Sequence, residues 1–186
     1  MQVTVNIKYY KYSLLLLFSI ILITACDHGL EPRLEPSIPD STKISGFEGT
    51  VTFIGEWSDS IKRAFVVVFQ NPLLTPGDFT ILNLKFLSRE IPLRVPTYKY
   101  SSLDSAYIPS VPEPFPSGSY AYVAVVQQST EELSLARKDW FVSGIYYANG
   151  DTTKPGTMVI PDSTFVENVN ITVDFNNPPP QPPGYN

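Results

Sequence analysis

Few side chains in this sequence are suited to catalysis. The chain holds one cysteine, Cys26, and one histidine, His28, two residues apart and ahead of every segment with the pattern of a β-strand. A Ser-His or Cys-His pair therefore cannot form within a folded domain, and a zinc site built on histidine is excluded for the same reason. The sequence predicts neither a nucleophilic triad nor a histidine-based metal centre.

Carboxylates are the remaining catalytic candidates. A glycosidase needs two of them roughly 5–9 Å apart, and the acidic residues here are scattered among predicted turns. Asn149, Asp151 and Asp162 offer oxygen ligands for calcium, but the spacing of an EF-hand loop is absent and turn chemistry explains Gly150 and Asp151. We therefore predict a protein without enzyme activity, metal or cofactor. A carboxylate-dependent hydrolase is the least favoured alternative.

Four aromatic residues are the best candidates for ligand binding. Trp57, Trp140, Tyr146 and Tyr147 fall at the ends of predicted strands or beside loops. Exposed rings of this kind stack on sugars, whereas the competing interpretation is packing in the core or at a sheet edge, which strands favour in any case. A carbohydrate-binding face is thus the alternative to a module that binds another protein.

The first 25 residues have the order of a secretory signal. Lys8 and Lys11 precede an apolar run from Leu14 to Ala25, and no acidic residue interrupts them. The run is 12 residues long, whereas a membrane-spanning helix needs roughly 20. We expect a signal helix that is cleaved off, with an uncleaved signal anchor as the alternative.

The end of this run suggests how the protein is held. Ile23-Thr24-Ala25-Cys26 resembles the bacterial lipobox. The resemblance implies cleavage before Cys26, a diacylglycerol on its thiol and a further acyl chain on the new amino terminus. Stable anchoring needs at least two such chains. We expect a lipoprotein of the cell envelope, with the outer membrane as the favoured location, facing the periplasm or the surface. An ordinary signal with a coincidental cysteine is the alternative.

Charge limits the partners of the mature chain. Loss of Lys8 and Lys11 leaves 11 basic residues against 18 acidic ones, so the net charge moves from −5 to −7. An acidic surface argues against nucleic acid and against adhesion to anionic lipid. Contact with the membrane should therefore be made by the lipid on Cys26. About 160 residues remain, enough for one domain that folds around a core without a disulfide.

The mature chain divides into three parts. Residues 26–42 form a proline-rich tether, residues 43–175 the folded domain, and residues 176–186 a proline-rich tail that cannot join a sheet and is predicted to be disordered.

Short segments rich in Val, Ile, Phe and Tyr predict an all-β domain. Residues 64–69 are apolar on both faces and indicate a covered central strand, whereas 169–175 alternate and indicate one wet face. Asn149-Gly150 is the strongest hairpin signal. The other expected strands cover 44–54, 97–101, 106–108, 119–127, 140–147 and 157–160, while 78–87 suits a short helix or a strand. Seven or eight such strands predict an antiparallel, immunoglobulin-like β-sandwich.

One stretch carries a resemblance. Pro116-Ser117-Gly118-Ser119-Tyr120, leading into an apolar strand, resembles carboxypeptidase-regulatory-like and transthyretin-like modules, as does the closing alternation from Asn170 to Phe175. The long insertion between Asn71 and Pro96 departs from their compact form. The resemblance implies a β-sandwich with a structural or binding role. We therefore expect a lipid-anchored, non-catalytic module that contacts another envelope component.

Overall fold

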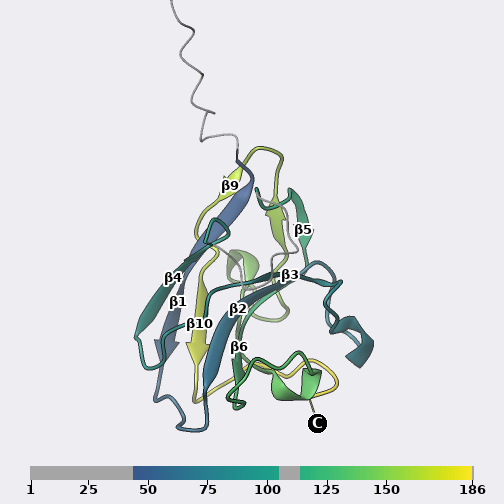
Figure 1. Cartoon of the computed structure of the whole chain (residues 1–186). Helices are drawn as coiled ribbons and strands as arrows, with labels where there is room; N and C mark the ends of the chain where they lie inside the picture. The colour runs from purple at the N-terminus through teal and green to yellow at the C-terminus, as the bar shows by residue number, and fades with distance from the viewer. Residues whose placement is uncertain (1–43, 105–113, 186) are drawn as a thin grey trace, which may run out of the picture. The chain divides into compact units, whose positions relative to one another are not determined.

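The computed structural model describes residues 44–104 and 114–185 (Figure 1). The predicted signal, Cys26, His28, the tether 26–42 and the strand candidate 106–108 lie outside these residues. The described part is built of short strands with three single-turn 3₁₀ helices between them, and an all-β fold is confirmed. The strands are β1 (Gly46–Ile54), β2 (Arg63–Phe69), β3 (Leu84–Leu87), β4 (Thr97–Ser101), β5 (Gly118–Tyr120), β6 (Tyr122–Gln128), β7 (Phe141–Ile145), β8 (Met158–Ile160), β9 (Phe165–Val166) and β10 (Ile171–Asp174).

Most strands belong to one mixed sheet. Its order is β3-β2-β6-β7-β10-β1-β4, with β9 added to β1, and β5 and β8 form a separate pair. β1 runs parallel to β10 and to β9, while the other pairs are antiparallel. The expectation of antiparallel strands alone is therefore wrong. Alternation along a strand reports which face is buried, but not the direction of the neighbouring strand.

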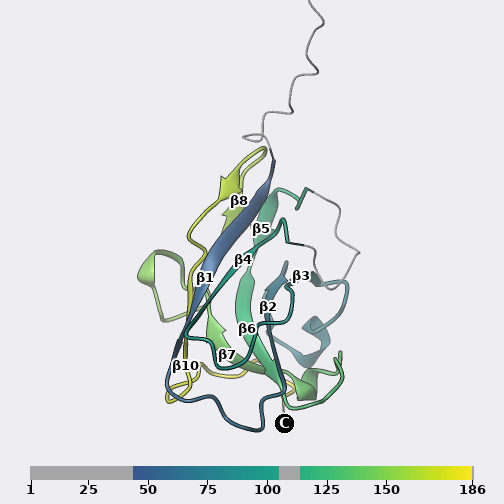
Figure 2. The same ribbon diagram turned by 60° about the vertical axis from the view of Figure 1, so that its left-hand side comes forward.

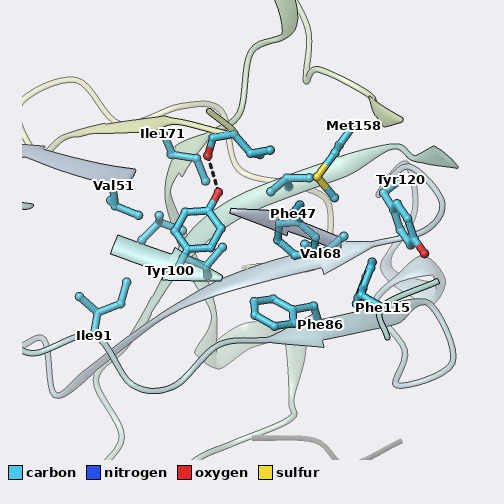
Figure 3. Packing of buried hydrophobic residues seen from close by; sticks show 14 of the residues in the cluster. Phe47, Val51, Val68, Phe86, Ile91, Tyr100, Phe115, Tyr120, Met158 and Ile171 are labelled. Atoms are coloured by element: carbon cyan, nitrogen blue, oxygen red, sulfur yellow. Dashed lines mark hydrogen bonds between the residues drawn. The ribbon is translucent and has the colours of Figure 1, made fainter. Parts of the chain in front are cut away.

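The sheet curls so that distant strands face each other across a core (Figure 3). The Phe47 ring on β1 lies edge-on to the rings of Phe86 on β3, at 5.1 Å, and Phe115, at 4.9 Å. β3 is nonetheless the first strand of the sheet and β1 the sixth. We call the residues enclosed by this curl the inner cluster. Its buried members are Phe47, Val51, Ala64, Val66, Val68, Phe86, Ile91, Tyr100, Phe115, Tyr120, Val123, Val125, Met158, Ile160, Val169, Ile171 and Val173.

The opposite face of β2, β3, β6 and β7 carries a second apolar cluster. β2 is buried on both sides, as predicted, because Phe65, Val67 and Phe69 point away from the inner cluster. The loop between β2 and β3 and the loop between β6 and β7 cover this face. We call this the outer cluster: Phe65, Val67, Phe69, Leu73, Leu84, Leu87, Tyr122, Ala124, Val126, Trp140, Val142 and Ile145, with Phe79, Leu133 and Tyr147 packed against them.

The expected strand 119–127 is divided at Ala121. The Ala121 N–H donates to the Gln70 carbonyl, at 3.1 Å, outside the ladder. On either side of this break, Tyr120 enters the inner cluster and Tyr122 the outer one. β5 consequently leaves the main sheet and pairs with β8 (Figure 2).

Asn149-Gly150 does not close a hairpin. Both residues have the left-handed conformation that such a turn requires, with φ of 55° and 75°. However, β7 ends at Ile145, and β8 pairs with β5. The Gly156 N–H instead donates to the Tyr146 carbonyl, at 2.8 Å, and a Cβ at Gly156 would lie 2.2 Å from the Ala148 nitrogen. The loop folds back on itself, so the hairpin prediction is wrong.

The proline-rich tail is held against the domain rather than disordered. The Arg137 guanidinium donates to the carbonyls of Pro182, at 2.6 Å, and Pro183, at 3.2 Å. The Gln181 side chain donates to the Val142 carbonyl, at 2.7 Å, and accepts from the Val142 N–H, at 2.8 Å. Proline cannot donate to a ladder, but its carbonyl can accept a bond, and the carboxamide of Gln181 pairs as a backbone peptide would. Composition alone therefore did not predict that this tail is bonded to the domain.

Candidate functional site

Trp140, one of the four predicted ligand-binding aromatics, is buried. Its exposed fraction is 0%, and its ring lies 5.4 Å from that of Phe79 within the outer cluster. The indole Nε1–H donates to the Ser134 carbonyl at 2.6 Å. Trp140 therefore anchors a loop and presents no surface to a ligand.

The other three aromatics do not form a common face. Trp57 packs between Phe53, at 4.6 Å, and Phe175, at 4.9 Å, at the margin of the inner cluster. Tyr146 packs against the inner cluster and Tyr147 against the outer one, since neighbours along an extended chain point to opposite faces. Of the three, Tyr147 lines one of the surface hollows found over the sheet.

Two adjoining hollows lie beside β7 and β10. The first, of about 470 Å³, lies between the loop that follows β1, the ends of β6 and β10, the start of β7 and the tail. The second, of about 630 Å³, follows β10 and β7 beside the prolines 178–180. They share Ser143, Asp174 and Pro178. We call the two together the trough.

The alternation of β10 supplies the row of polar side chains along the trough. Ile171 and Val173 point into the inner cluster, so Thr172 and Asp174 must point to the other face, with Asn170 in phase with them just before the strand. The sequence predicted this wet face. It did not predict that the proline-rich tail would lie beside this face and form one side of the trough.

Aromatic rings stand at both ends of the trough. Tyr147 lines the second hollow. Phe141 and Tyr185 line the first, with their ring centroids 5.5 Å apart and their planes at 64°. The Arg137 guanidinium lies 5.5 Å from the centre of the Tyr185 ring and 5.4 Å from that of Phe79. Burial lowers the pKa of Arg137 below its usual value. Sequence reasoning missed Phe141 and Tyr185, because the tail that carries Tyr185 was taken for disordered.

Gln127 is the buried polar group that stands out in the first hollow. It lines the hollow with an exposed fraction of 6%, and its Nε2 has no hydrogen-bond partner among the described residues. A buried donor without a partner costs about 1–3 kcal/mol. Its neighbour Gln128, on the opposite face, is fully used, because its amide donates to the Ser134 carbonyl at 2.7 Å and accepts from the Ser134 N–H at 3.3 Å.

The charged groups of the first hollow are mainly acidic. Glu56, Asp139 and Asp174 line it, together with Lys138. Asp174 accepts a bond from the Asn176 N–H at 3.0 Å, and Asp139 accepts one from the Ser134 hydroxyl. Both carboxylates therefore order neighbouring turns.

The calcium candidates are used in separate turns. Asp151 accepts bonds from the N–H of Thr153, at 3.0 Å, and from its hydroxyl, at 2.6 Å, whereas Asp162 accepts one from the Ser117 hydroxyl. Hydrogen bonds from Thr153 hold the pKa of Asp151 below its usual value. Within residues 44–104 and 114–185, no three His, Cys, Asp or Glu side chains are grouped to hold a metal ion.

Comparison with known proteins adds no family. No family model, curated protein or solved structure matches this chain. In the described ranges there is no helix of the length and apolarity needed to cross a membrane. A functional proposal therefore depends on the sequence pattern and on the trough.

Proposed function

We propose that this chain is an exported bacterial lipoprotein that displays its β-domain in the cell envelope as a non-catalytic interaction module. The observation that carries the proposal is the position of Cys26, the single cysteine of the chain, at the end of an apolar run that resembles a lipobox. Residues 27–45 then separate the acylated cysteine from β1. The partner is another envelope component, with the outer membrane as the favoured location.

We also propose that the domain is related to carboxypeptidase-regulatory-like and transthyretin-like modules. The Tyr120 hydroxyl donates to the Pro116 carbonyl at 2.7 Å, across the turn that carried the resemblance. The Tyr120 ring is buried in the inner cluster, 5.0 Å from that of Phe115. A tyrosine that fastens a proline-glycine turn to a core strand supports the relationship.

The anchor is tested by comparing the wild type with Cys26→Ala in the native host. We expect the wild type to partition into detergent and the variant to stay soluble or unprocessed, because the variant has no thiol to acylate. Mass spectrometry of the amino-terminal peptide identifies the acyl chains. Equal membrane association of the two proteins, with no acyl chain on the amino-terminal peptide of the wild type, would refute the anchor. Protease treatment of intact cells then distinguishes a surface-facing domain, which is cleaved, from a periplasmic one.

The second candidate function is carbohydrate binding, and the trough favours it. Aromatic rings at its two ends and a row of hydroxyl, amide and carboxylate groups between them are the groups that sugars use. Since three carboxylates also line the first hollow, incubation with oligosaccharides should be followed by an assay for new reducing ends. We expect none, and their appearance would replace the non-catalytic proposal with hydrolysis.

A further inference from the structure

We propose that the trough binds a neutral, linear oligosaccharide laid along β10, with Thr172 and Asp174 among the groups that hold it. The inference depends on the second candidate function and is independent of the lipid anchor. It assigns the binding to a surface that does not include Trp57 or Trp140.

The first step concerns the class of ligand. A peptide that binds by strand addition needs a free sheet edge, but β10 is paired on both sides, with β7 and with β1. The trough therefore offers side-chain groups rather than a backbone ladder. These groups are polar along the row formed by Asn170, Thr172 and Asp174. A ligand that carries hydroxyl groups along its whole length fits such a row, whereas a peptide with apolar side chains does not.

The second step concerns the capacity for new hydrogen bonds. Asn170 uses its Oδ1 to accept from the Thr50 N–H, at 2.9 Å, and Asp174 uses its Oδ1 to accept from the Asn176 N–H. In the described part of the chain, the Thr172 hydroxyl and the second oxygen of Asp174 are left for a ligand. Gln127 does not belong to this row, because it lies opposite Ala64 in the pairing of β6 with β2 and its side chain is on the face of the inner cluster.

The third step concerns charge. Three carboxylates and one ammonium group line the first hollow. A uronate or phosphate there would face repulsion that a neutral sugar does not. The trough should therefore discriminate against acidic glycans.

The fourth step concerns position. β1 begins at one end of the domain, and the carboxyl terminus lies at the other, in both views (Figures 1 and 2). The first hollow is formed partly by the tail, including Tyr185. The binding surface thus lies away from the end at which the chain enters the domain, where a tethered module can present it to a partner.

The test measures binding by the full chain, purified in detergent micelles, to neutral oligosaccharides such as cello-, xylo- and manno-hexaose and to oligogalacturonate. A glycan array identifies the tightest neutral probe, and calorimetry gives its Kd. We expect binding to at least one neutral probe and at least tenfold weaker binding to oligogalacturonate. Absence of binding to every neutral probe, or preference for the acidic one, would overturn the proposal.

A matched pair of variants locates the binding surface. Thr172→Val removes one hydroxyl from the trough and keeps a β-branched side chain, so we expect about a fivefold weaker Kd from the lost hydrogen bond. Thr97→Val makes the same change on β4, which is two strands away, and should leave the Kd unchanged. Equal effects of the two variants would place the sugar elsewhere.

Asp174→Asn separates ligand binding from folding. Asparagine keeps a side-chain oxygen that can accept from the Asn176 N–H, so the thermal midpoint should change little, while the Kd should weaken about fivefold because a charged acceptor is lost. Unchanged binding in both Asp174→Asn and Thr172→Val would refute the assignment. Because detergent partitioning of Cys26→Ala is measured separately, failure of the anchor and failure of the trough remain distinguishable.

Discussion

The inner and outer clusters lie on two faces of one sheet but are closed in different ways. Strands enclose most of the inner cluster, and its rings pack edge to face, as Phe47 does with Phe86 and Phe115. Loops cover the outer cluster, and buried side chains form hydrogen bonds with the backbone of these loops. The Ser134 carbonyl, for example, accepts one bond from Gln128 and one from Trp140. A loop has no ladder to satisfy its N–H and C=O groups. Covering a core with loops therefore requires buried polar side chains beside the apolar ones.

This difference has a consequence for stability. The inner cluster should be lost only when the whole sheet unfolds, because most of its members come from strands distributed across the sheet. The covering of the outer cluster can open locally, since it depends on a few side-chain bonds from Arg137, Trp140 and Gln181.

The largest expected effect is that of Phe47→Ala. Phe47 has an exposed fraction of 0% and touches three other rings, so the cavity should cost about 3–5 kcal/mol of unfolding free energy. Urea denaturation followed by tryptophan fluorescence measures it. Phe141→Ala is the control, because Phe141 is half-buried at the margin of the trough, and should cost less. Similar losses for the two variants would contradict the distinction between core and covering.

Trp140→Phe should have a smaller and more local effect. Phenylalanine keeps an aromatic ring but leaves a gap and loses the bond to the Ser134 carbonyl, which together should cost about 1–3 kcal/mol. Hydrogen exchange should accelerate for the amides of residues 134–139 more than for those of β1. Uniform acceleration in both regions would show that the outer covering does not open on its own.

The sequence predicted the inner cluster better than the outer one. The reason is how far apart in the sequence the contacting residues lie. Alternation in β10 reports directly that Ile171 and Val173 are buried. The docking of the tail depends on bonds between residues far apart in sequence, such as Arg137 to Pro182. Composition therefore predicted disorder for a segment that these side chains hold, and the aromatic pair of the trough was missed with it.

The site was harder to predict than the fold for the same reason. Tryptophan is a residue type that stacks on sugars, yet Trp140 packs within the outer cluster. Thr172 and Asp174 become candidates only when β7, β10 and the tail are side by side. The Asn149-Gly150 turn adopts its expected conformation, yet β8 pairs elsewhere. The local sequence predicted the conformation of the turn correctly, but it carried no information about which strand β8 would pair with.

Gln181→Ala tests the attachment of the tail. Both backbone groups of Val142 lose the partner that the carboxamide provides, and since Gln181 is partly exposed, water replaces part of the loss. We expect about 1 kcal/mol of destabilisation and faster removal of the tail by carboxypeptidase. Pro180→Ala, at an exposed position of the same tail, should cost less and leave the tail protected. Equal digestion of Gln181→Ala and the wild type would refute the docking.

The smallest expected effect is a pH dependence confined to the loop over the outer cluster. The Asp78 carboxylate accepts bonds from the N–H groups of Thr75, at 2.6 Å, and Leu74, at 2.9 Å, and these hold its pKa below the ordinary value of 3.8. A carboxyl with a lowered pKa in the folded state stabilises the loop above the unfolded pKa, and this contribution is lost as the pH falls through the folded value. Below pH 3.8 the amide resonances of Leu74 and Thr75 should therefore shift with a midpoint lower than 3.8. Those of Val66, Val67 and Val68 should stay unchanged, since β2 and the strands paired with it, β3 and β6, carry no carboxylate. Asp78→Asn should abolish the shift, and a midpoint at or above 3.8 in the wild type would show that the carboxylate does not hold this part of the covering.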